Sequence, residues 1–375
     1  MKKKFDFLLV CVSFALTIGF GMWIYLRPHE NFSVSEKRAL AQFPDFSVEK
    51  IADGDFSRGL SSFYTDQFPL REKFTSLKAM SEISLLRREN NGVILGSDGY
   101  LVMNPRYGEL SGYEENLGAV RSFCDKYRAA GIETDIFLAP RGADVLSSYL
   151  PSIYENTGGD RVWNMAFEAL PELIDATDAI SAAARKGERV WYRTDHHWTA
   201  LGAYECYASL MEQFGGTTPI SVSALRRETV SEVFRGSCYS KFGYLGIDSE
   251  PSFLLRYEGD EGYNVVYHES GRTAQGFYSA ENADGYEVFF GGNYGHISIK
   301  SEEDSERETL LLIKDSFANS VVPFLAAHYD IEIYDLRYFT CSIGEEIESI
   351  QPDRILILYG IDTAVTDGSL KRLLR

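Results

Sequence analysis

Two segments of the chain combine residue types that cooperate in acyl transfer. The first is the tetrapeptide Asp-His-His-Trp at residues 195–198. In an extended segment, residues two positions apart point to the same side, so the Asp195 carboxylate can orient the His197 imidazole and stabilise its charged form. The same geometry turns His196 to the opposite side. This spacing predicts a general base held by a carboxylate.

Metal binding by the two adjacent histidines is the competing interpretation of this segment. A zinc site draws three or four ligands from Cys, His, Asp and Glu side chains. Rings that face opposite ways rarely share one ion, and the sequence offers no obvious third ligand beside His196 and His197. We therefore predict that this site holds no metal and that its chemistry uses no cofactor.

The second segment places Ser316 at the end of an apolar run. Residues 310–313 read Leu-Leu-Leu-Ile, which is typical of a buried strand, and a helix is predicted over residues 318–327. A hydroxyl at such a junction projects from the carboxyl edge of a sheet, where crevices form and helix N–H groups stabilise developing negative charge. The alternative is a plain helix N-cap, a role that Asp315 or Ser316 could fill.

Asn293 and Arg141 are candidates for oxyanion or substrate binding. Two glycines precede Asn293 and permit a tight turn that presents its amide to a site, although a simple hairpin loop would use the same residues. Arg141 follows a predicted strand at residues 134–138, where its guanidinium could hold an acidic or oxyanionic group. A surface arginine is the alternative interpretation there.

The elements around these residues alternate between helix and strand. The predicted strands are residues 134–138, 190–192, 309–313, 331–336 and 354–358, and the predicted helices are residues 113–130, 318–327 and 344–350. This order predicts an α/β fold with a doubly wound parallel sheet, in which the last three strands are neighbours. Residues 215–305 are rich in Gly, Tyr and Ser and are predicted to form a β-rich insertion that shapes the cleft.

The N-terminal part of the chain carries a membrane signal. Residues 7–26 form an apolar run of the ~20 residues needed to span a hydrocarbon core, and three lysines precede it. The positive-inside rule then places the N-terminus in the cytoplasm and the rest of the chain outside the cell membrane. A cleaved signal peptide is the alternative, but a clear Ala-x-Ala site is missing. The predicted organisation is a signal anchor at residues 1–27, a stalk and helical lead-in at residues 28–89, and the α/β domain at residues 90–375, opened by a hairpin of residues 93–95 and 100–102.

The net charge bears on the kind of partner, and the cysteine spacing bears on metal fingers and disulfide bridges. The formal net charge is −18, and the clustered Lys and Arg of nucleic-acid-binding proteins are missing, which excludes nucleic acid as a partner. The five cysteines show no CxxC or metal-finger spacing. A bridge between Cys206 and Cys238 would suit an oxidising compartment, and isolated buried thiols are the alternative.

Taken together, these motifs resemble those of the bacterial DHHW-motif proteins, which are similar to the alginate O-acetylation proteins of the SGNH-hydrolase-like superfamily. The resemblance runs from about Glu36 to the C-terminus. The segments that carry it are Thr194–Thr199, Lys314–Phe317, Asp335–Phe339, Gly291–Asn293 and Asp66–Arg71. Two departures matter. Lys314 replaces the usual glycine, and the Asp-x-His element precedes the serine, which implies a circularly permuted sheet.

The resemblance implies that Ser316, His197 and Asp195 carry an acyl transfer on a polymer outside the cytoplasm. Ser316 would attack an acetyl ester, and a polysaccharide hydroxyl would resolve the acyl-enzyme, which describes an O-acetyltransferase. Resolution by water would describe an acetyl esterase. Because the sequence has no acetyl-CoA motif outside the membrane, a transferase would take its acetyl group from a membrane-bound O-acyltransferase partner. A non-catalytic polysaccharide-binding scaffold is the remaining alternative.

Overall fold

The computed structural model describes residues 2–33, 38–154, 158–215, 217–279, 285–303 and 306–374. Two compact units make up the chain. Unit 1 comprises residues 1–90 and 240–246, and unit 2 comprises residues 91–239 and 247–375.

Unit 1 is mainly helical. Its elements are α1 (Lys2–Leu26), β1 (Phe32–Ser33), β2 (Arg38–Ala39), α2 (Val48–Ala52), α3 (Asp55–Asp66), α4 (Arg71–Ser84) and β3 (Glu89–Asn90). The helices α3 and α4 are separate because Pro69 disfavours helical geometry at Phe68. Over Phe5–Leu26, α1 is long and apolar enough to cross a membrane.

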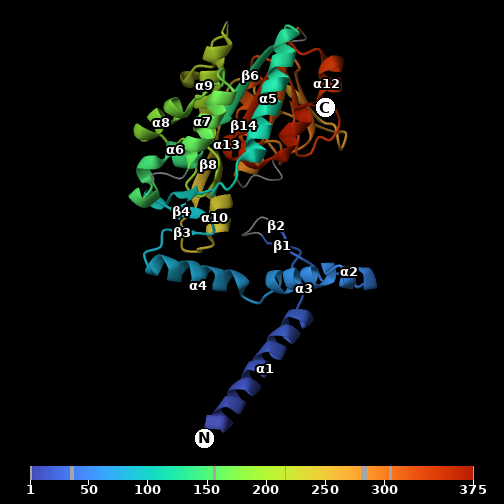
Figure 1. The fold of residues 1–375 in the computed structure, drawn as a ribbon. Helices are drawn as coiled ribbons and strands as arrows, with labels where there is room; N and C mark the ends of the chain where they lie inside the picture. The colour runs from blue at the N-terminus through green and yellow to red at the C-terminus, as the bar shows by residue number, and fades with distance from the viewer. Residues whose placement is uncertain are drawn as a thin grey trace. The chain divides into compact units, whose positions relative to one another are not determined.

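The remaining helices and strands lie in unit 2, except that α10 continues into residues 240–242 of unit 1 (Figure 1). They are β4 (Val93–Leu95), β5 (Leu101–Met103), α5 (Ser111–Ala129), β6 (Glu133–Ala139), α6 (Gly142–Val145), α7 (Gly159–Ala169), α8 (Thr177–Arg185), α9 (Ala200–Phe214), β7 (Arg226–Phe234), α10 (Ser237–Phe242), β8 (Glu250–Arg256), β9 (Tyr263–Tyr267), β10 (Arg272–Gln275), β11 (His296–Ser301), β12 (Thr309–Lys314), α11 (Val322–Leu325), β13 (Asp330–Tyr334), α12 (Ile343–Ile350), β14 (Arg354–Gly360) and α13 (Ile361–Thr366). Short 3₁₀ helices cover Tyr286–Val288 and Ser316–Ser320.

A seven-stranded sheet forms the centre of unit 2. Its strand order is β10-β9-β11-β13-β12-β14-β6. The strand β12 lies between β13 and β14 and is parallel to both, and β14 is parallel to β6. The prediction that three C-terminal strands are parallel neighbours is therefore confirmed.

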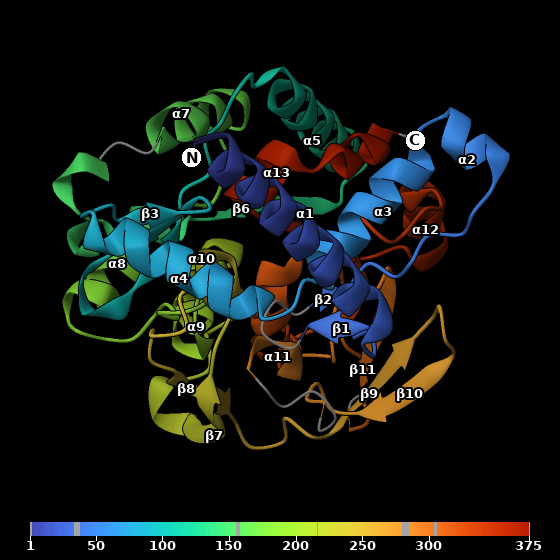
Figure 2. The same ribbon diagram turned by 90° about the horizontal axis from the view of Figure 1, so that it is seen from below.

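The predicted parallel sheet forms only part of the observed sheet, which is mixed. The strands β9, β10 and β11 come from the segment predicted as an insertion, and they extend the sheet with antiparallel pairing. Among the described strands of that segment, β7 and β8 form a pair apart from the sheet, as Figure 2 shows. Free edges of a sheet pair readily with another strand, which explains why alternating segments from residues 263–301 join the parallel core.

Helices pack against both faces of the sheet. On one face, Leu310 and Leu312 of β12 pack in a cluster with Met211 of α9. On the other face, Leu311 and Ile313 pack in a second cluster with residues of α5, α7 and α12. Both faces of β12 are thus buried, which explains its unbroken apolar sequence.

Two local predictions have different outcomes. The hairpin of β4 and β5 is confirmed, with Val93 opposite Met103. The strand predicted at residues 190–192 is wrong, because Trp191 forms only an isolated bridge to Trp198. The chain bends over residues 193–197 and turns back, so no ladder can extend from this bridge. Cys206 and Cys238 are both buried and form no disulfide bridge with each other.

Candidate active site

Asp315 performs the capping role at the end of β12. Its Oδ1 accepts a hydrogen bond from the Phe317 N–H at 2.9 Å, and its Oδ2 accepts one from the Gly360 N–H at 2.9 Å. This arrangement caps the helix that starts at Ser316 and ties β12 to the end of β14. The Ser316 hydroxyl is therefore not needed as a cap and is available for another partner.

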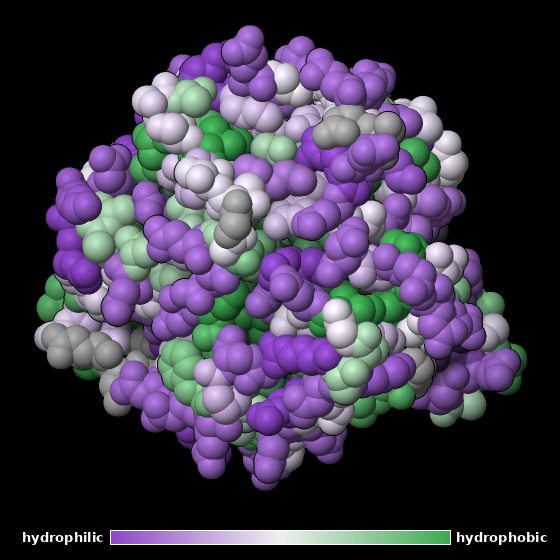
Figure 3. Space-filling view, turned by 90° about the horizontal axis from the view of Figure 1, so that it is seen from above, coloured by the Kyte–Doolittle hydropathy of each residue, from purple (hydrophilic) through white to green (hydrophobic). Residues whose placement is uncertain are grey.

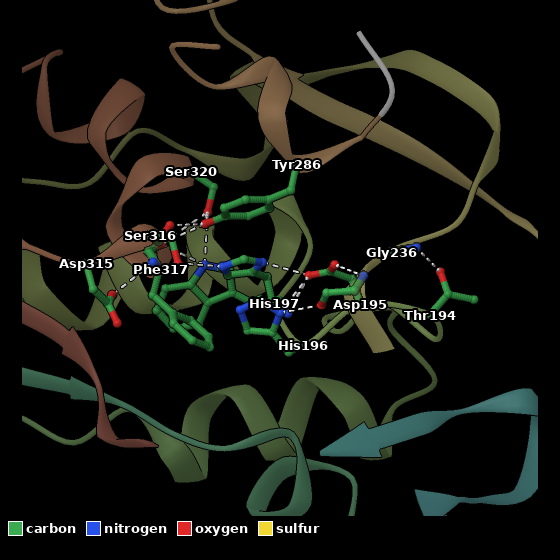
Figure 4. Close-up of polar contacts among 12 residues, drawn as sticks. Thr194, Asp195, His196, His197, Gly236, Tyr286, Asp315, Ser316, Phe317 and Ser320 are labelled. Atoms are coloured by element: carbon green, nitrogen blue, oxygen red, sulfur yellow. Dashed lines mark hydrogen bonds and ion pairs between the residues drawn. The ribbon is translucent and has the colours of Figure 1, made fainter. Parts of the chain in front are cut away.

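The structure brings Ser316, His197 and Asp195 together in a hydrogen-bonded chain (Figure 4). The Ser316 Oγ lies 2.9 Å from the His197 Nε2, and the His197 Nδ1 lies 2.7 Å from the Asp195 Oδ1. The serine and the histidine are 119 residues apart in the sequence. This is the order of contacts in which a carboxylate orients an imidazole and the imidazole accepts a hydroxyl proton.

The predicted orientation of His196 is wrong. The Asp195 Oδ1 accepts the His197 backbone N–H at 2.9 Å, and this contact bends the segment that the prediction took as extended. As a result, the His196 ring lies against the His197 ring, with centroids 3.8 Å apart, as Figure 4 shows. The His196 Nδ1 is 2.5 Å from the Ser237 Oγ, so this ring contacts the histidine of the site but not Ser316.

Buried polar contacts fix the bent segment. Glu250 is buried and accepts hydrogen bonds from the Thr194 N–H and hydroxyl, both at 2.7 Å, and from the Arg193 N–H at 3.0 Å. On the other side of the site, the Trp198 Nε1 donates to the Ser320 Oγ at 2.9 Å. Sequence reasoning missed Glu250, because it lies 56 residues from Thr194 and no local pattern marks it.

Tyr286 is a second site residue that sequence reasoning missed. Its ring stacks on the His197 ring, with centroids 3.8 Å apart and planes 2° apart. Its hydroxyl lies 2.8 Å from the Ser316 carbonyl oxygen and 3.0 Å from the Ser320 Oγ. One tyrosine therefore holds both the imidazole and the turn that carries the hydroxyl. No sequence pattern distinguishes Tyr286 from the other tyrosines, of which the chain has 23 in all.

An ionised carboxylate and a neutral imidazole lie beside His197. Burial raises the pKa of the Asp195 carboxyl, but the His196 and His197 rings and the hydrogen bonds to the carboxylate lower it by more. The pKa of Asp195 therefore lies well below its usual range, and this residue stays ionised. Burial, together with the adjacent His197, lowers the pKa of His196, so His196 is neutral near pH 7. A charge that forms on His197 would thus face an ionised carboxylate.

Lys314, the departure from the family pattern, is buried beside the site. Its Nζ donates to the Asn319 Oδ1 at 2.9 Å, to the Asn293 Oδ1 at 3.2 Å and to the Asp335 Oδ2 at 3.4 Å. Burial lowers the pKa of Lys314, while Asp335 opposes that change. The contacts of Asn293 therefore run to Lys314 and Asn319, which flank the Ser316 segment, rather than to Ser316 itself.

Arg141 lies on the His196 side of the site. The alternative of a surface arginine is wrong, because the residue is 5% exposed and pairs with Asp144 in a capping box at the start of α6. Its Nη1 has no hydrogen-bond partner among the described residues. Together with His196 and Phe317, it lines a cavity of about 110 Å³.

The bent geometry reopens the question of a metal ion. The ligand atoms of Asp195, His196 and His197 lie within 4.8 Å of one another. The two rings therefore do not face opposite ways, and their orientation does not exclude a shared ion. However, both Asp195 oxygens already accept hydrogen bonds, Oδ1 from His197 and Oδ2 from the Ser237 N–H at 2.7 Å. A metal would have to displace these contacts.

We therefore expect a chelator such as EDTA to leave ester hydrolysis by this protein unchanged, and added zinc to give no increase. The measurement is the rate of p-nitrophenyl acetate hydrolysis before and after chelation. Loss of activity with EDTA and its return with zinc would contradict the metal-free site.

Comparison with known proteins identifies the relatives of this chain. Residues 180–335 match the family model described as DHHW protein. Residues 93–233 match the model described as SGNH hydrolase-like domain, acetyltransferase AlgX. The predicted resemblance to the DHHW proteins is confirmed.

Two solved structures share the fold of this chain. A DHHW family protein from Eubacterium siraeum is 23% identical and has a TM-score of 0.64 over 76% of this chain and 95% of that chain. PatB1 from Bacillus cereus is 20% identical and has a TM-score of 0.62 over 74% of this chain and 98% of that chain. At these identities, the likeness establishes the fold.

Curated relatives match this chain over only part of their own length. The probable alginate O-acetylase AlgJ of Pseudomonas fluorescens is 24% identical over 62% of this chain and 58% of the relative. That of Pseudomonas putida is 24% identical over 52% of this chain and 50% of the relative. The chain thus spans about half the length of the curated relatives that it matches.

Proposed function

We propose that this chain is an extracytoplasmic O-acetyltransferase that modifies a cell-surface or exported polysaccharide through an acyl-Ser316 intermediate. The observation that carries the proposal is the hydrogen-bonded chain from the Ser316 Oγ through His197 to Asp195. The similarity to proteins named probable alginate O-acetylase, and to a family model described as acetyltransferase AlgX, supports the reaction class and a polysaccharide acceptor.

The contacts suit a two-step transfer. In the first step, the Ser316 Oγ attacks the carbonyl carbon of an acetyl ester while the His197 Nε2 takes its proton, and His197 then returns the proton to the departing alcohol oxygen. In the second step, His197 takes the proton of an acceptor hydroxyl, whose oxygen attacks the acyl carbon, and His197 then returns the proton to the departing Ser316 Oγ. Asp195 holds the imidazole throughout and stabilises its positive charge.

Two further residues complete the proposed site. The Asn293 Oδ1 faces the donors of Lys314 and Asn319, which leaves its NH₂ group for the oxyanion of the tetrahedral intermediate. The unpartnered Nη1 of Arg141 suits an anionic group of the substrate. The acetyl donor is proposed to be a membrane-bound O-acyltransferase, because the sequence of the outward part has no acetyl-CoA motif.

Sulfonyl labelling and ester hydrolysis together test the function. One structure of Bacillus cereus PatB1 contains a sulfonyl adduct. We expect phenylmethylsulfonyl fluoride to add one sulfonyl group to this chain, detected by mass spectrometry, and to abolish hydrolysis of p-nitrophenyl acetate. The variant Ser316→Ala should take up no label.

The same assay separates the alternatives. Faster p-nitrophenol release and acetylated product on addition of a polysaccharide acceptor would support the transferase. A rate that no acceptor changes would indicate an esterase. If the chain takes up no label and hydrolyses no ester, it is a non-catalytic polysaccharide-binding scaffold.

We also propose that α1 remains as a single-pass anchor with the N-terminus in the cytoplasm. The length and hydropathy of Phe5–Leu26 and the three preceding lysines support it. We expect protein purified from membranes to begin at or near Met1 when its N-terminus is sequenced. A mature start near residues 22–30 would mean that the segment is a cleaved signal.

The order of motifs supports a further proposal, that the sheet is a circular permutation of the usual SGNH arrangement. Asp195 and His197 precede Ser316 here. Superposition on an SGNH hydrolase in which the serine comes first checks this. Equivalent strand positions with different connections are expected, and identical connections would contradict the proposal.

A further inference from the structure

Unit 1 exposes more large apolar side chains than unit 2. Among the described residues after α1, twelve such side chains of unit 1 are exposed: Phe32, Phe43, Phe46, Val48, Ile51, Leu70, Phe74, Leu77, Met80, Leu85, Leu86 and Leu245. The much longer unit 2 exposes six: Ile153, Phe167, Val222, Val233, Tyr338 and Leu374. In the space-filling view of Figure 3, hydrophilic residues dominate the visible face, and apolar ones form small separate patches. Concentrated apolar surface marks an interaction site.

One side of α4 carries a continuous apolar stripe. Phe74 and Leu77 lie three residues apart on one helical face, and Leu70 is the N-cap residue that precedes the helix; these side chains are about half exposed, at 51%, 52% and 54%. On the other side of the helix, Ala79 is fully buried. The Ser76 Oγ accepts a hydrogen bond from the Leu245 N–H at 3.1 Å. The helix is thus packed on its own unit along one side and uncovered along the apolar side.

Aromatic contacts join this stripe to the apolar span of α1. Phe20 of α1 stacks on Phe68, with ring centroids 5.7 Å apart, and Phe68 contacts Phe74 of α4 at 5.8 Å. Tyr25 of α1 also contacts Phe43, at 6.2 Å. Phe20 lies six residues before the end of α1, which corresponds to about 9 Å of helix rise. Phe68 and Phe74 therefore lie beside the outer part of the apolar span.

The charge of this region suits a lipid surface. Residues 1–90 contain 13 basic and 11 acidic residues, whereas residues 91–375 contain 24 basic and 44 acidic residues. Lys73 and Lys78 are exposed and flank the stripe on α4, and the Lys78 Nζ donates to the Asn90 Oδ1 at 3.2 Å. A lysine in the position of Lys73 buries its carbon chain along apolar surface and extends the ammonium group to lipid headgroups. The net negative charge that opposes lipid binding thus comes from residues 91–375.

We propose that the stripe of α4 lies in the outer interface of the lipid bilayer that α1 crosses. The inference rests on the proposed anchoring of α1 and adds a second contact with the membrane. The occupant of the apolar stripe is lipid, because the stripe continues the surface of the membrane-spanning helix through Phe68. Such a contact restricts the motion of unit 1 at the membrane, close to a membrane-bound acetyl donor.

Depth-dependent fluorescence quenching in vesicles tests the proposal. The full chain, with Cys11→Ser and Cys341→Ser to remove the exposed thiols, receives a nitrobenzoxadiazole label at Leu77→Cys, or at Ser81→Cys one turn further along the same face. Glu72→Cys, exposed away from the stripe, is the matched control. Phosphatidylcholine–phosphatidylglycerol vesicles carry a doxyl quencher near the headgroups.

We expect the labels at positions 77 and 81 to emit at shorter wavelength than the control and to be quenched roughly twofold or more strongly by doxyl lipid. Equal, water-like emission at all three positions would overturn the proposal. Blue-shifted emission without quenching by doxyl lipid would also overturn it, because a protein would then cover the stripe. Recovery of the chain in the vesicles and sulfonyl labelling of Ser316 report separately on the anchor and on the proposed reaction.

Discussion

Replacing Ser316 or His197 by alanine is expected to lower kcat/KM for p-nitrophenyl acetate by about three orders of magnitude or more, and combining both changes should cost little beyond either one. The two side chains act on the same proton, since the Ser316 Oγ lies 2.9 Å from the His197 Nε2. Once either is missing, the other has no partner in the reaction. Asp195→Ala should cost somewhat less, because the imidazole remains in place without its orienting carboxylate.

Two neighbouring residues provide matched controls for this experiment. Ser320→Ala removes a hydroxyl from the same turn that contacts Trp198 and Tyr286 but not His197. His196→Ala removes a ring that touches His197 but not Ser316. Both should retain most of the activity, with a modest loss from altered packing. Activity that survives Ser316→Ala, or that falls equally in Ser320→Ala, would contradict a serine nucleophile at position 316.

Adding a single methyl group behind Asp195 should also inactivate the protein. A Cβ at Gly236 would lie 2.3 Å from the Asp195 Cβ and 2.7 Å from its Cα, far inside van der Waals contact. Because the backbone of Asp195 is among the atoms met, a change of rotamer cannot relieve the clash. Gly236→Ala should therefore displace the carboxylate that orients His197 and lower kcat/KM by about 100-fold.

The control for this change is Gly118→Ala in α5, where a Cβ meets nothing within 4 Å. This variant should hydrolyse p-nitrophenyl acetate at the normal rate. Thermal unfolding of both variants separates loss of the site from loss of the fold. A folded Gly236→Ala protein with normal kcat/KM would show that the position of Asp195 does not matter for the reaction.

The sequence by itself determined which residues could do chemistry and which strands form the core. The unbroken apolar run of β12, followed by polar residues, places Ser316 at the carboxyl edge of the sheet without knowledge of any distant contact. The spacing of Asp195 and His197 similarly brings carboxylate and imidazole together, because a gap of two residues is a local constraint. Such effects act between residues that are close in the sequence, so the pattern of apolar residues and the spacing of polar ones reveal them directly.

Tertiary structure decided the contacts between distant segments. Glu250 and Tyr286 reach the site across 56 and 30 residues, and no local pattern distinguishes them from other buried side chains. The orientation of His196 depends on a bend that Asp195 and buried Glu250 impose, which an extended-segment rule cannot contain. The pairing of β11 with β13 likewise follows from which edge of the folded core is free. These features depend on which surfaces meet after folding, and local sequence does not record that.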